Sequence, residues 1–188
     1  MTQRPAPVEL TGADCVVRRI RAGEWLKVKE LRLAALADPA APIAFLETFD
    51  GASKQPDQFW MDRAAGAAEG SVAQFIAEDS SGAWLGSLVV IVFEAGSEDY
   101  WGKTVAARRA NVVGVFIHPE NRGKGLIEAL FAAGKEFAVA QGLDTLYLEV
   151  HRDNVGARRA YERAGFVLTG EILESEAGID DEMVARLR

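Results

Sequence analysis

The chain has 188 residues, of which 49% are hydrophobic and 26% are charged, a balance typical of one soluble globular domain. Its formal net charge of −7 argues against nucleic acid as a partner, because a phosphate backbone needs a basic protein surface. The longest apolar run, residues 88–93, is too short to cross a bilayer, so no membrane partner is expected.

At the N-terminus, residues 1–13 lack the apolar segment of a secretory signal, and we interpret them as a flexible leader. Residues 14–188 contain neither a repeat nor a linker, which predicts a single domain. The single cysteine, Cys15, excludes an internal disulfide framework and is typical of a cytoplasmic protein. A buried or unreactive thiol explains it more simply than a nucleophile does.

Apolar residues at helical spacing predict helices over 23–37 and 59–68, after a first short strand at 16–21. Strands are expected at 72–78, 84–93 and 111–117, with a long polar stretch, 94–108, before the last of them. Helices at 125–141 and 154–164 then alternate with strands at 145–150, 166–172 and 182–187. This order indicates a mixed α/β domain rather than a regular doubly wound one.

A basic turn with two glycines joins the strand that ends at Ile117 to the next helix. The free N–H groups of a helix start attract an anion, and Gly123 and Gly125 let the backbone approach it closely. Arg122 and Lys124 add positive charge. The turn therefore predicts a pyrophosphate site, although a purely structural turn with solvated basic side chains would have the same sequence pattern.

Two better-known phosphate loops do not fit this turn. A Walker loop needs glycine where His118 stands and serine or threonine where Gly125 stands. The dinucleotide fingerprint needs a third glycine at the position of Glu128.

A second group of polar residues follows the strand at 145–150. Asn154, Ala157 and Tyr161 lie at i, i+3 and i+7 and therefore share one side of the predicted helix. Glu149 near the strand end and Tyr161 on the helix are positioned to act as a base and an acid. The alternatives are a surface ion pair for Glu149 and a core aromatic role for Tyr161.

Together these segments resemble the GNAT acetyltransferase superfamily. The family turn, Arg/Gln-x-x-Gly-x-Gly/Ala, is matched by residues 122–127 except at the last position, where Ile127 is bulky. The downstream family pattern, Asn-x-x-Ala-x-x-x-Tyr-x-x-x-Gly-Phe, is complete at Asn154, Ala157, Tyr161, Gly165 and Phe166. The close match covers a minority of the chain, whereas the element order covers nearly all of it.

The resemblance implies a mostly antiparallel mixed sheet with flanking helices, splayed between the strands that end at Ile117 and Val150. It implies acetyl-CoA as cosubstrate in this V-shaped gap, with the pantetheine arm paired along the first strand and the pyrophosphate at the turn. The residues implied as its contacts are Val115, Phe116, Ile117, Arg122, Gly123, Lys124, Gly125, Leu126, Ile127 and Asn154. Ile127 either shifts the phosphates or turns its side chain to the core and leaves its N–H free.

The resemblance also implies that a primary amine attacks the thioester directly. Tyr161 would protonate the leaving thiolate, and Glu149 would take the proton of the amine. Glu149 is chosen because Leu-Glu-Val before the asparagine motif is similar to the protein N-terminal acetyltransferases of the ribosomal-protein branch. The other interpretation is a structural Glu149 with ordered water as the base. The sequence has no cluster of histidine, cysteine or carboxylate residues that would suggest a metal site.

The acceptor is expected to be a small-molecule amine or a peptide or protein N-terminus, selected by the loops at 38–50, 94–108 and 171–181. The last loop is acidic and would attract a cationic amine, although a solvated hairpin explains its charges equally well. A homodimer is also considered. The rival functions are a non-catalytic acyl-CoA-binding or sensing domain and an interaction module built on the 94–108 loop.

Overall fold

The computed structural model describes residues 8–9, 15–175 and 177–188. The strands are β1 (Val8–Glu9), β2 (Cys15–Arg19), β3 (Val72–Asp79), β4 (Trp84–Phe93), β5 (Arg109–Ile117), β6 (Thr145–His151), β7 (Val167–Ser175) and β8 (Gly178–Arg186). The helices are α1 (Trp25–Leu36), α2 (Phe49–Ser53), α3 (Asp57–Ala68), α4 (Leu126–Ala140) and α5 (Val155–Arg163). Short 3-10 turns cover Ala22–Glu24, Ala41–Ile43 and Pro119–Asn121.

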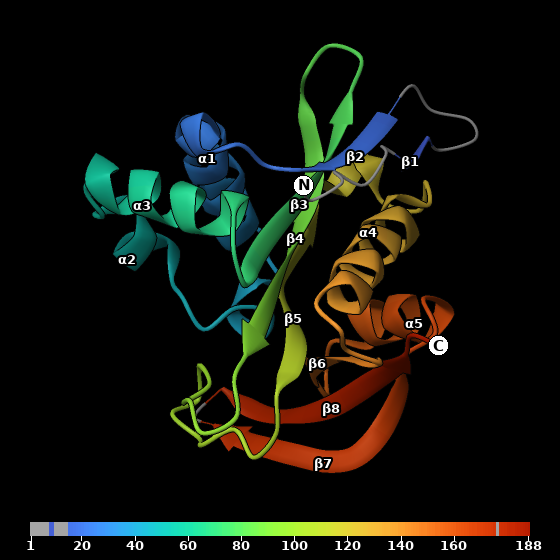
Figure 1. Cartoon of the computed structure of the whole chain (residues 1–188). Coiled ribbons are helices and arrows are strands. Elements are labelled where there is room, and N and C mark those ends of the chain that lie inside the picture. Colours follow the sequence, from blue (N-terminus) through green and yellow to red (C-terminus); the bar gives the residue numbers. More distant parts are fainter. Residues whose placement is uncertain (1–7, 10–14, 176) are drawn as a thin grey trace.

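One sheet organises the chain, in the strand order β1-β2-β3-β4-β5-β6-β8-β7 (Figure 1). All neighbouring strands are antiparallel except β5 and β6, which are parallel. The expected mixed, mostly antiparallel sheet with flanking helices is thus confirmed. The sequence did not predict β1 or α2. Of the expected leader, 1–13, only Val8–Glu9 lie within the described residues, and they pair with β2.

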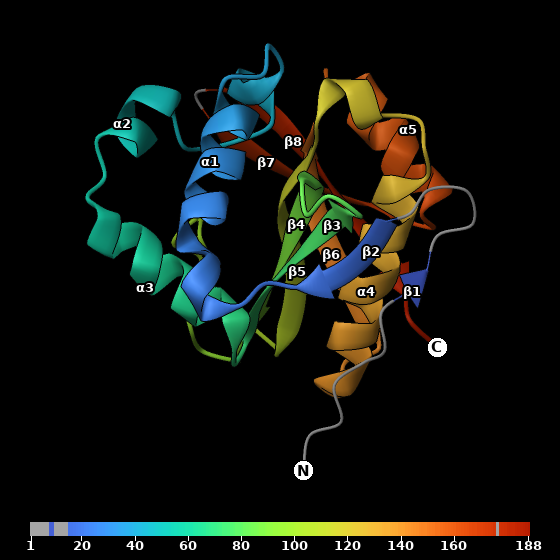
Figure 2. The ribbon, with the colours of Figure 1, turned by 90° about the horizontal axis from the view of Figure 1, so that it is seen from above.

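The sheet lies between two layers of helices, with α1, α2 and α3 on one side and α4 and α5 on the other (Figure 2). Strand alternation sends Leu148 and Val150 of β6 into the core under α4 and α5. Phe116 of β5 instead joins the core under α1 and α3, where Trp60 is fully buried. Cys15 is a buried free thiol. Among the described residues, no helix combines the length and apolar character needed to span a bilayer.

The strands β5 and β6 separate after a short paired stretch. Their parallel ladder joins Ala110–Val112 to Leu146–Leu148. Beyond it, β5 bends at Gly114, whose φ of 62° a side chain would strain, where the register with β4 shifts. The rest of β5 therefore turns an unpaired backbone edge toward the gap, at the place predicted between Ile117 and Val150.

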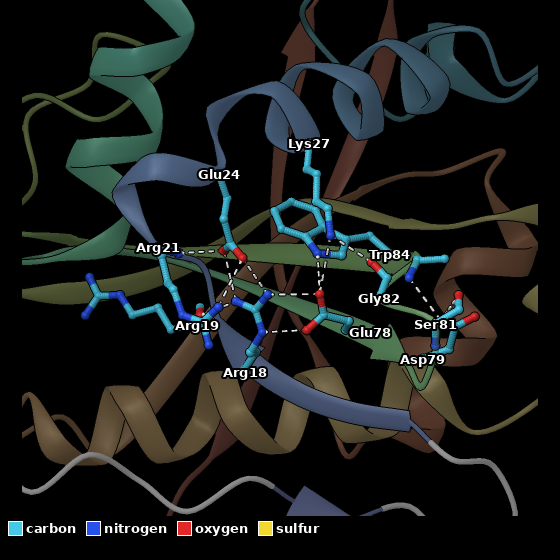
Figure 3. A network of polar contacts seen from close by, with 11 residues as sticks. Arg18, Arg19, Arg21, Glu24, Lys27, Glu78, Asp79, Ser81, Gly82 and Trp84 are labelled. Atoms are coloured by element: carbon cyan, nitrogen blue, oxygen red, sulfur yellow. Dashed lines mark hydrogen bonds and ion pairs between the residues drawn. The ribbon is translucent and has the colours of Figure 1, made fainter.

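An ion-pair network fastens the N-terminal strand to the sheet and to α1 (Figure 3). Arg18 of β2 donates to Glu24 at 2.6 and 2.9 Å and to Glu78 of β3 at 2.7 and 3.0 Å. Trp84 of β4 donates its indole N–H to Glu78 at 3.2 Å, and Lys27 of α1 lies 3.5 Å from the same carboxylate. One guanidinium thus links several elements that are far apart in sequence.

The network shifts the titration of its carboxylates. The hydrogen bond from Arg18 lowers the pKa of Glu78. Burial acts to raise the pKa of Glu24, but hydrogen bonds from Arg18 and from the Arg21 backbone lower it on balance. Because both folded-state pKa values are depressed, this stabilisation is present above the ordinary glutamate pKa of about 4.3. It is lost as the pH falls through the lower folded-state values.

We therefore expect Arg18→Met to lower the free energy of unfolding by about 2 kcal/mol near neutral pH, because two part-buried carboxylates lose their main partner. Urea unfolding between pH 3 and 7 measures this, and the difference from wild type should shrink at the acid end. Lys54→Met is the matched control, because the Lys54–Asp50 pair is 72% and 78% exposed. Equal losses in both variants would contradict the assigned role of Arg18.

Candidate active site

A cleft of about 1150 Å³ occupies the gap between β5 and β6. The end of β5, the N-terminus of α4, one side of α5 and the end of β6 form one part of its wall. Residues 40–47, α3 and the 94–108 loop form the other part. The candidate acid and base, Tyr161 and Glu149, both line it.

The predicted phosphate turn has an open backbone at the start of α4. Gly123 and Gly125 adopt φ values of 74° and 78°, and Gly125 is the N-cap of the helix. A β-carbon on either glycine would meet no atom within 4 Å, so the space beside them is open to the cleft. The first N–H groups of α4 have no partner inside the helix and point along the positive end of its dipole. The turn is therefore suited to an anion.

The basic side chains of this turn are held by the protein. Arg122 donates to the carbonyl oxygen of Ile117 at 3.1 Å and to the carboxylate of Asp38 at 2.5 Å. Lys124 donates to the Asn121 side chain at 2.9 Å. Arg122 thus fixes the turn against the segment after α1, and the turn offers an anion mainly its backbone N–H groups.

Ile127 is the position at which the turn departs from the family pattern. Its side chain is half-buried and packs against the core under α4, beside the fully enclosed Leu126. Ile127 thus packs partly against the core and also lines the cleft, and its N–H lies in the first turn of α4.

The downstream motif lies on α5. Asn154 caps this helix by accepting the N–H of Ala157 at 3.2 Å, and it also lines the cleft. Tyr161 is buried, with its ring edge-on to Phe131 at a centroid distance of 5.4 Å. Burial raises the pKa of Tyr161, so the phenol keeps its proton at neutral pH, as an acid must.

Glu149 is the centre of a polar network on the opposite face of β6. Tyr100 donates its hydroxyl to one carboxylate oxygen, and Asn111 donates to the other oxygen at 3.0 Å. Asn111 also donates to the Tyr100 oxygen at 3.0 Å. Arg109 donates to Asn111 at 2.8 Å and to Glu182 at 2.8 Å. The alternative of a surface ion pair for Glu149 is therefore wrong, because the arginine in the network pairs with Glu182.

Burial raises the pKa of Glu149. The hydrogen bond from Tyr100 and the charge of Arg109 lower it in part, while the nearby Glu182 and Asp99 raise it further. The net effect is a carboxylate that binds a proton more readily than an exposed glutamate does. A buried carboxylate whose pKa is raised is a candidate general base.

Tyr100 and Asn111 are the partners that the sequence did not assign to Glu149. The unusual length of the 94–108 loop pointed to a functional segment, and Asn111 is a polar residue within a valine-rich strand. Trp101 from the same loop also lines the cleft, and its buried indole N–H has no hydrogen-bond partner among the described residues.

Comparison with known proteins assigns the class. Residues 25–166 match the model of the acetyltransferase (GNAT) family. The chain therefore belongs to this family, as its motifs indicated.

The relatives with curated names match a shorter part. A mycothiol acetyltransferase from Streptomyces coelicolor is 42% identical over 69 residues, which are 36% of this chain and 22% of that protein. The corresponding protein from Clavibacter michiganensis is 39% identical over 67 residues, again 36% and 22%. The aligned part of the chain thus spans only 22% of the length of these curated relatives.

Solved structures show the same fold over nearly the whole chain. A GNAT acetyltransferase from Streptococcus pneumoniae has a TM-score of 0.71 at 16% identity, covering 92% of this chain and 98% of its own. A phosphinothricin acetyltransferase from Sinorhizobium meliloti, in complex with acetyl-CoA, has a TM-score of 0.67 at 16% sequence identity. The match covers 92% of this chain and 88% of that one. Spermidine N-acetyltransferase from Vibrio cholerae, in complex with coenzyme A and spermine, has a TM-score of 0.60 at 19% sequence identity. The match covers 93% of this chain and 96% of that one.

The network around Glu149 yields a direct test. Tyr100→Phe should raise the pKa of Glu149, because it removes a hydrogen bond that stabilises the carboxylate. Carbon-detected NMR titration of the glutamate carboxyl groups measures this, with Glu149→Gln to assign the signal. Tyr147→Phe is the matched control, since Tyr147 stacks on Arg109 at 3.8 Å on the same sheet face. An unchanged titration in Tyr100→Phe would show that the Tyr100 hydrogen bond does not lower the pKa of Glu149.

Proposed function

We propose that this protein transfers an acetyl group from acetyl-CoA to a primary amine. The observation that carries the proposal is the convergence of Glu149 and Tyr161 on one cleft, beside the open start of α4. Glu149 belongs to the sheet face under α1 and α3, and Tyr161 to the core under α4 and α5. The gap between β5 and β6 lets both groups reach the same space.

The proposed cosubstrate site follows the gap. The unpaired edge of β5 at Val115, Phe116 and Ile117 would pair with the amide groups of the pantetheine arm as an added strand does. The N–H groups of residues 122–127 would hold the pyrophosphate, and the free amide of Asn154 would contact the arm. Complexes of proteins with the same fold, with acetyl-CoA or with coenzyme A, support this assignment.

In the proposed reaction, Glu149 first accepts a proton from the ammonium form of the acceptor. The Tyr100 hydroxyl, already bonded to Glu149, has a lone pair that accepts an N–H of the acceptor. A proton can thus pass from nitrogen to the Tyr100 oxygen while the Tyr100 proton passes to Glu149. The neutral amine then attacks the thioester carbonyl, and a carbon–nitrogen bond forms.

The carbon–sulfur bond breaks when the tetrahedral intermediate collapses, and Tyr161 donates its proton to the departing thiolate. The acid and the base approach the reacting carbon from opposite sides of the sheet. This arrangement gives the leaving group and the nucleophile separate proton partners, so that neither residue has to serve both.

The cytoplasm is the proposed location, since the chain has one cysteine and its thiol is buried. A homodimer is proposed through β7, the outer strand of the sheet, where Val167, Leu168 and Ile172 are exposed. A peptide N-terminus and a small-molecule amine are both within the proposed range of acceptors.

The rival function is a non-catalytic acyl-CoA-binding domain. Tyr161→Phe separates the two functions, because an enzyme should lose about 10²- to 10⁴-fold in kcat while its affinity for acetyl-CoA stays the same. Glu149→Gln should lose a similar factor and flatten the acid limb of the pH–rate profile. Thiol release in the presence of an amine panel measures turnover, and calorimetry measures binding. Tyr147→Phe is the control. A wild-type protein that binds acetyl-CoA but acetylates no amine would support the rival.

The phosphate turn is tested by a matched pair of glycines. Gly125→Ala and Gly142→Ala both place a β-carbon in open space at φ values of 78° and 80°. Each should cost about 1 kcal/mol of stability through backbone strain. Gly125→Ala alone should also weaken acetyl-CoA binding, by about tenfold, because its methyl group enters the anion site. Equal affinities in the two variants would place the pyrophosphate elsewhere.

A further inference from the structure

Two arginines share one carboxylate in the wall of the cleft away from Tyr161. Arg32 of α1 donates to one oxygen of Glu47 at 2.8 Å. Arg63 of α3 lies 3.6 Å from the same oxygen, which is too long for a hydrogen bond. Arg32 also stacks on Phe45, with its guanidinium carbon 4.5 Å from the ring centroid. We call Arg32, Arg63 and Glu47 the arginine pair site, and all of its members line the cleft.

The charges at this site do not balance. The guanidinium groups of Arg32 and Arg63 both face Glu47, and both lie nearest the same carboxylate oxygen. Among the described residues, Arg63 forms no hydrogen bond, so its fork of N–H donors remains available. Burial lowers the pKa of Arg63, and the charge of Arg32 lowers it further, while Glu47 raises it in part. A second anion would satisfy both guanidinium groups.

The opposite end of the same cleft carries negative charge. Glu182, the register partner of Glu149 on β8, forms an ion pair with Arg109, whereas Glu149 and Asp180 both line the cleft. These carboxylates suit the cationic form of an acceptor amine. The cleft is therefore bipolar along one face of the sheet, with its positive end under α1 and α3 and its negative end on β6 and β8.

Strand spacing gives the scale of this arrangement. The arginine pair site adjoins Val89 of β4, and β5 separates β4 from β6. Two strand spacings of about 4.8 Å place the two ends of the cleft on the order of 10 Å apart. An extended peptide advances at most about 3.5 Å per residue, so a chain of about three residues bridges that distance.

We propose that the acceptor is an amine that also carries a carboxylate, with the amine at Glu149 and the carboxylate between Arg32 and Arg63. The inference rests on the proposed acetyl transfer and specifies its substrate class. A purely cationic polyamine would place a positive charge against two arginines and would be disfavoured.

The test compares triglycine with triglycine carboxamide at saturating acetyl-CoA. Both carry the same primary amine at the same distance, and only one carries the anion. The wild-type kcat/KM for triglycine should exceed that for its amide by about tenfold or more, as a charge-assisted contact implies. Glycine and its amide, which are too short to reach both ends, should differ less.

Variants at the site separate recognition from folding. Arg63→Met should abolish the preference for triglycine and leave the amide nearly unaffected. The matched control is Arg186→Met, which removes the same charge from an exposed position at the end of β8. Glu47→Gln is the decisive variant, because it removes the anion that competes for the arginines. It should lower the KM for triglycine selectively.

If the arginines serve only to hold residues 40–47 in place, Glu47→Gln will impair both acceptors alike. That result, or equal wild-type kcat/KM values for triglycine and its amide, would overturn the inference while acetyl transfer itself stands. Transfer to neither acceptor, nor to any other amine, by a protein that binds acetyl-CoA would instead overturn both the proposed function and this inference.

Discussion

The loss of pairing between β5 and β6 is the constraint on which the site depends. A parallel pair ordinarily continues for as long as its backbone groups face each other, but here Gly114 bends β5 and shifts its register with β4. The N–H and C=O groups beyond Val112 then face a gap. Unpaired backbone groups in the interior of a sheet cost free energy. A ligand that forms hydrogen bonds with them therefore replaces the bonds that β5 and β6 no longer make with each other.

The same break explains why residues from opposite faces of the sheet meet. In an intact sheet, Glu149 and the residues under α4 would be separated by the thickness of the backbone layer. The gap removes that layer locally. Glu149 can then be surrounded by polar groups of one face, while Tyr161 stays within the apolar core of the other face. Burial raises the pKa of both groups, and Glu149 also accepts hydrogen bonds from Tyr100 and Asn111.

Sequence reasoning reached the parts of the molecule whose pattern is local. The glycines of the turn and the positions of Asn154 and Tyr161 follow from spacing within a single helix and its entry. Tyr100 and Asn111 are separated from Glu149 by 49 and 38 residues along the chain. Helical or strand periodicity in the sequence cannot predict contacts over such separations. The arginine pair site is likewise assembled from α1, α3 and the segment between them.

The missed elements have a similar explanation. With five residues, α2 is too short to show a helical period, and β1, with two residues, exists only through its pairing with β2. Most other helices and strands were predictable to within a few residues, because several turns or several alternations repeat the same signal. The expected loop at 171–181 is an exception, since β7 continues to Ser175 and β8 begins at Gly178. The role of Ile127 needed the packing of α4, since the sequence alone allowed its side chain to point either way.

The gap that passes through the sheet has a consequence for the order of events. The start of α4 belongs to one helix layer, and the arginine pair site belongs to the other (Figure 2). A cosubstrate and an acceptor that bind as proposed would enter from these two layers and would not cross each other's path. Sterically, either one can arrive first and either product can depart first, so the fold itself imposes no sequence on a ternary complex. Any order observed in kinetics would then have its origin in the movement of the loops, above all 94–108, rather than in the shape of the sheet.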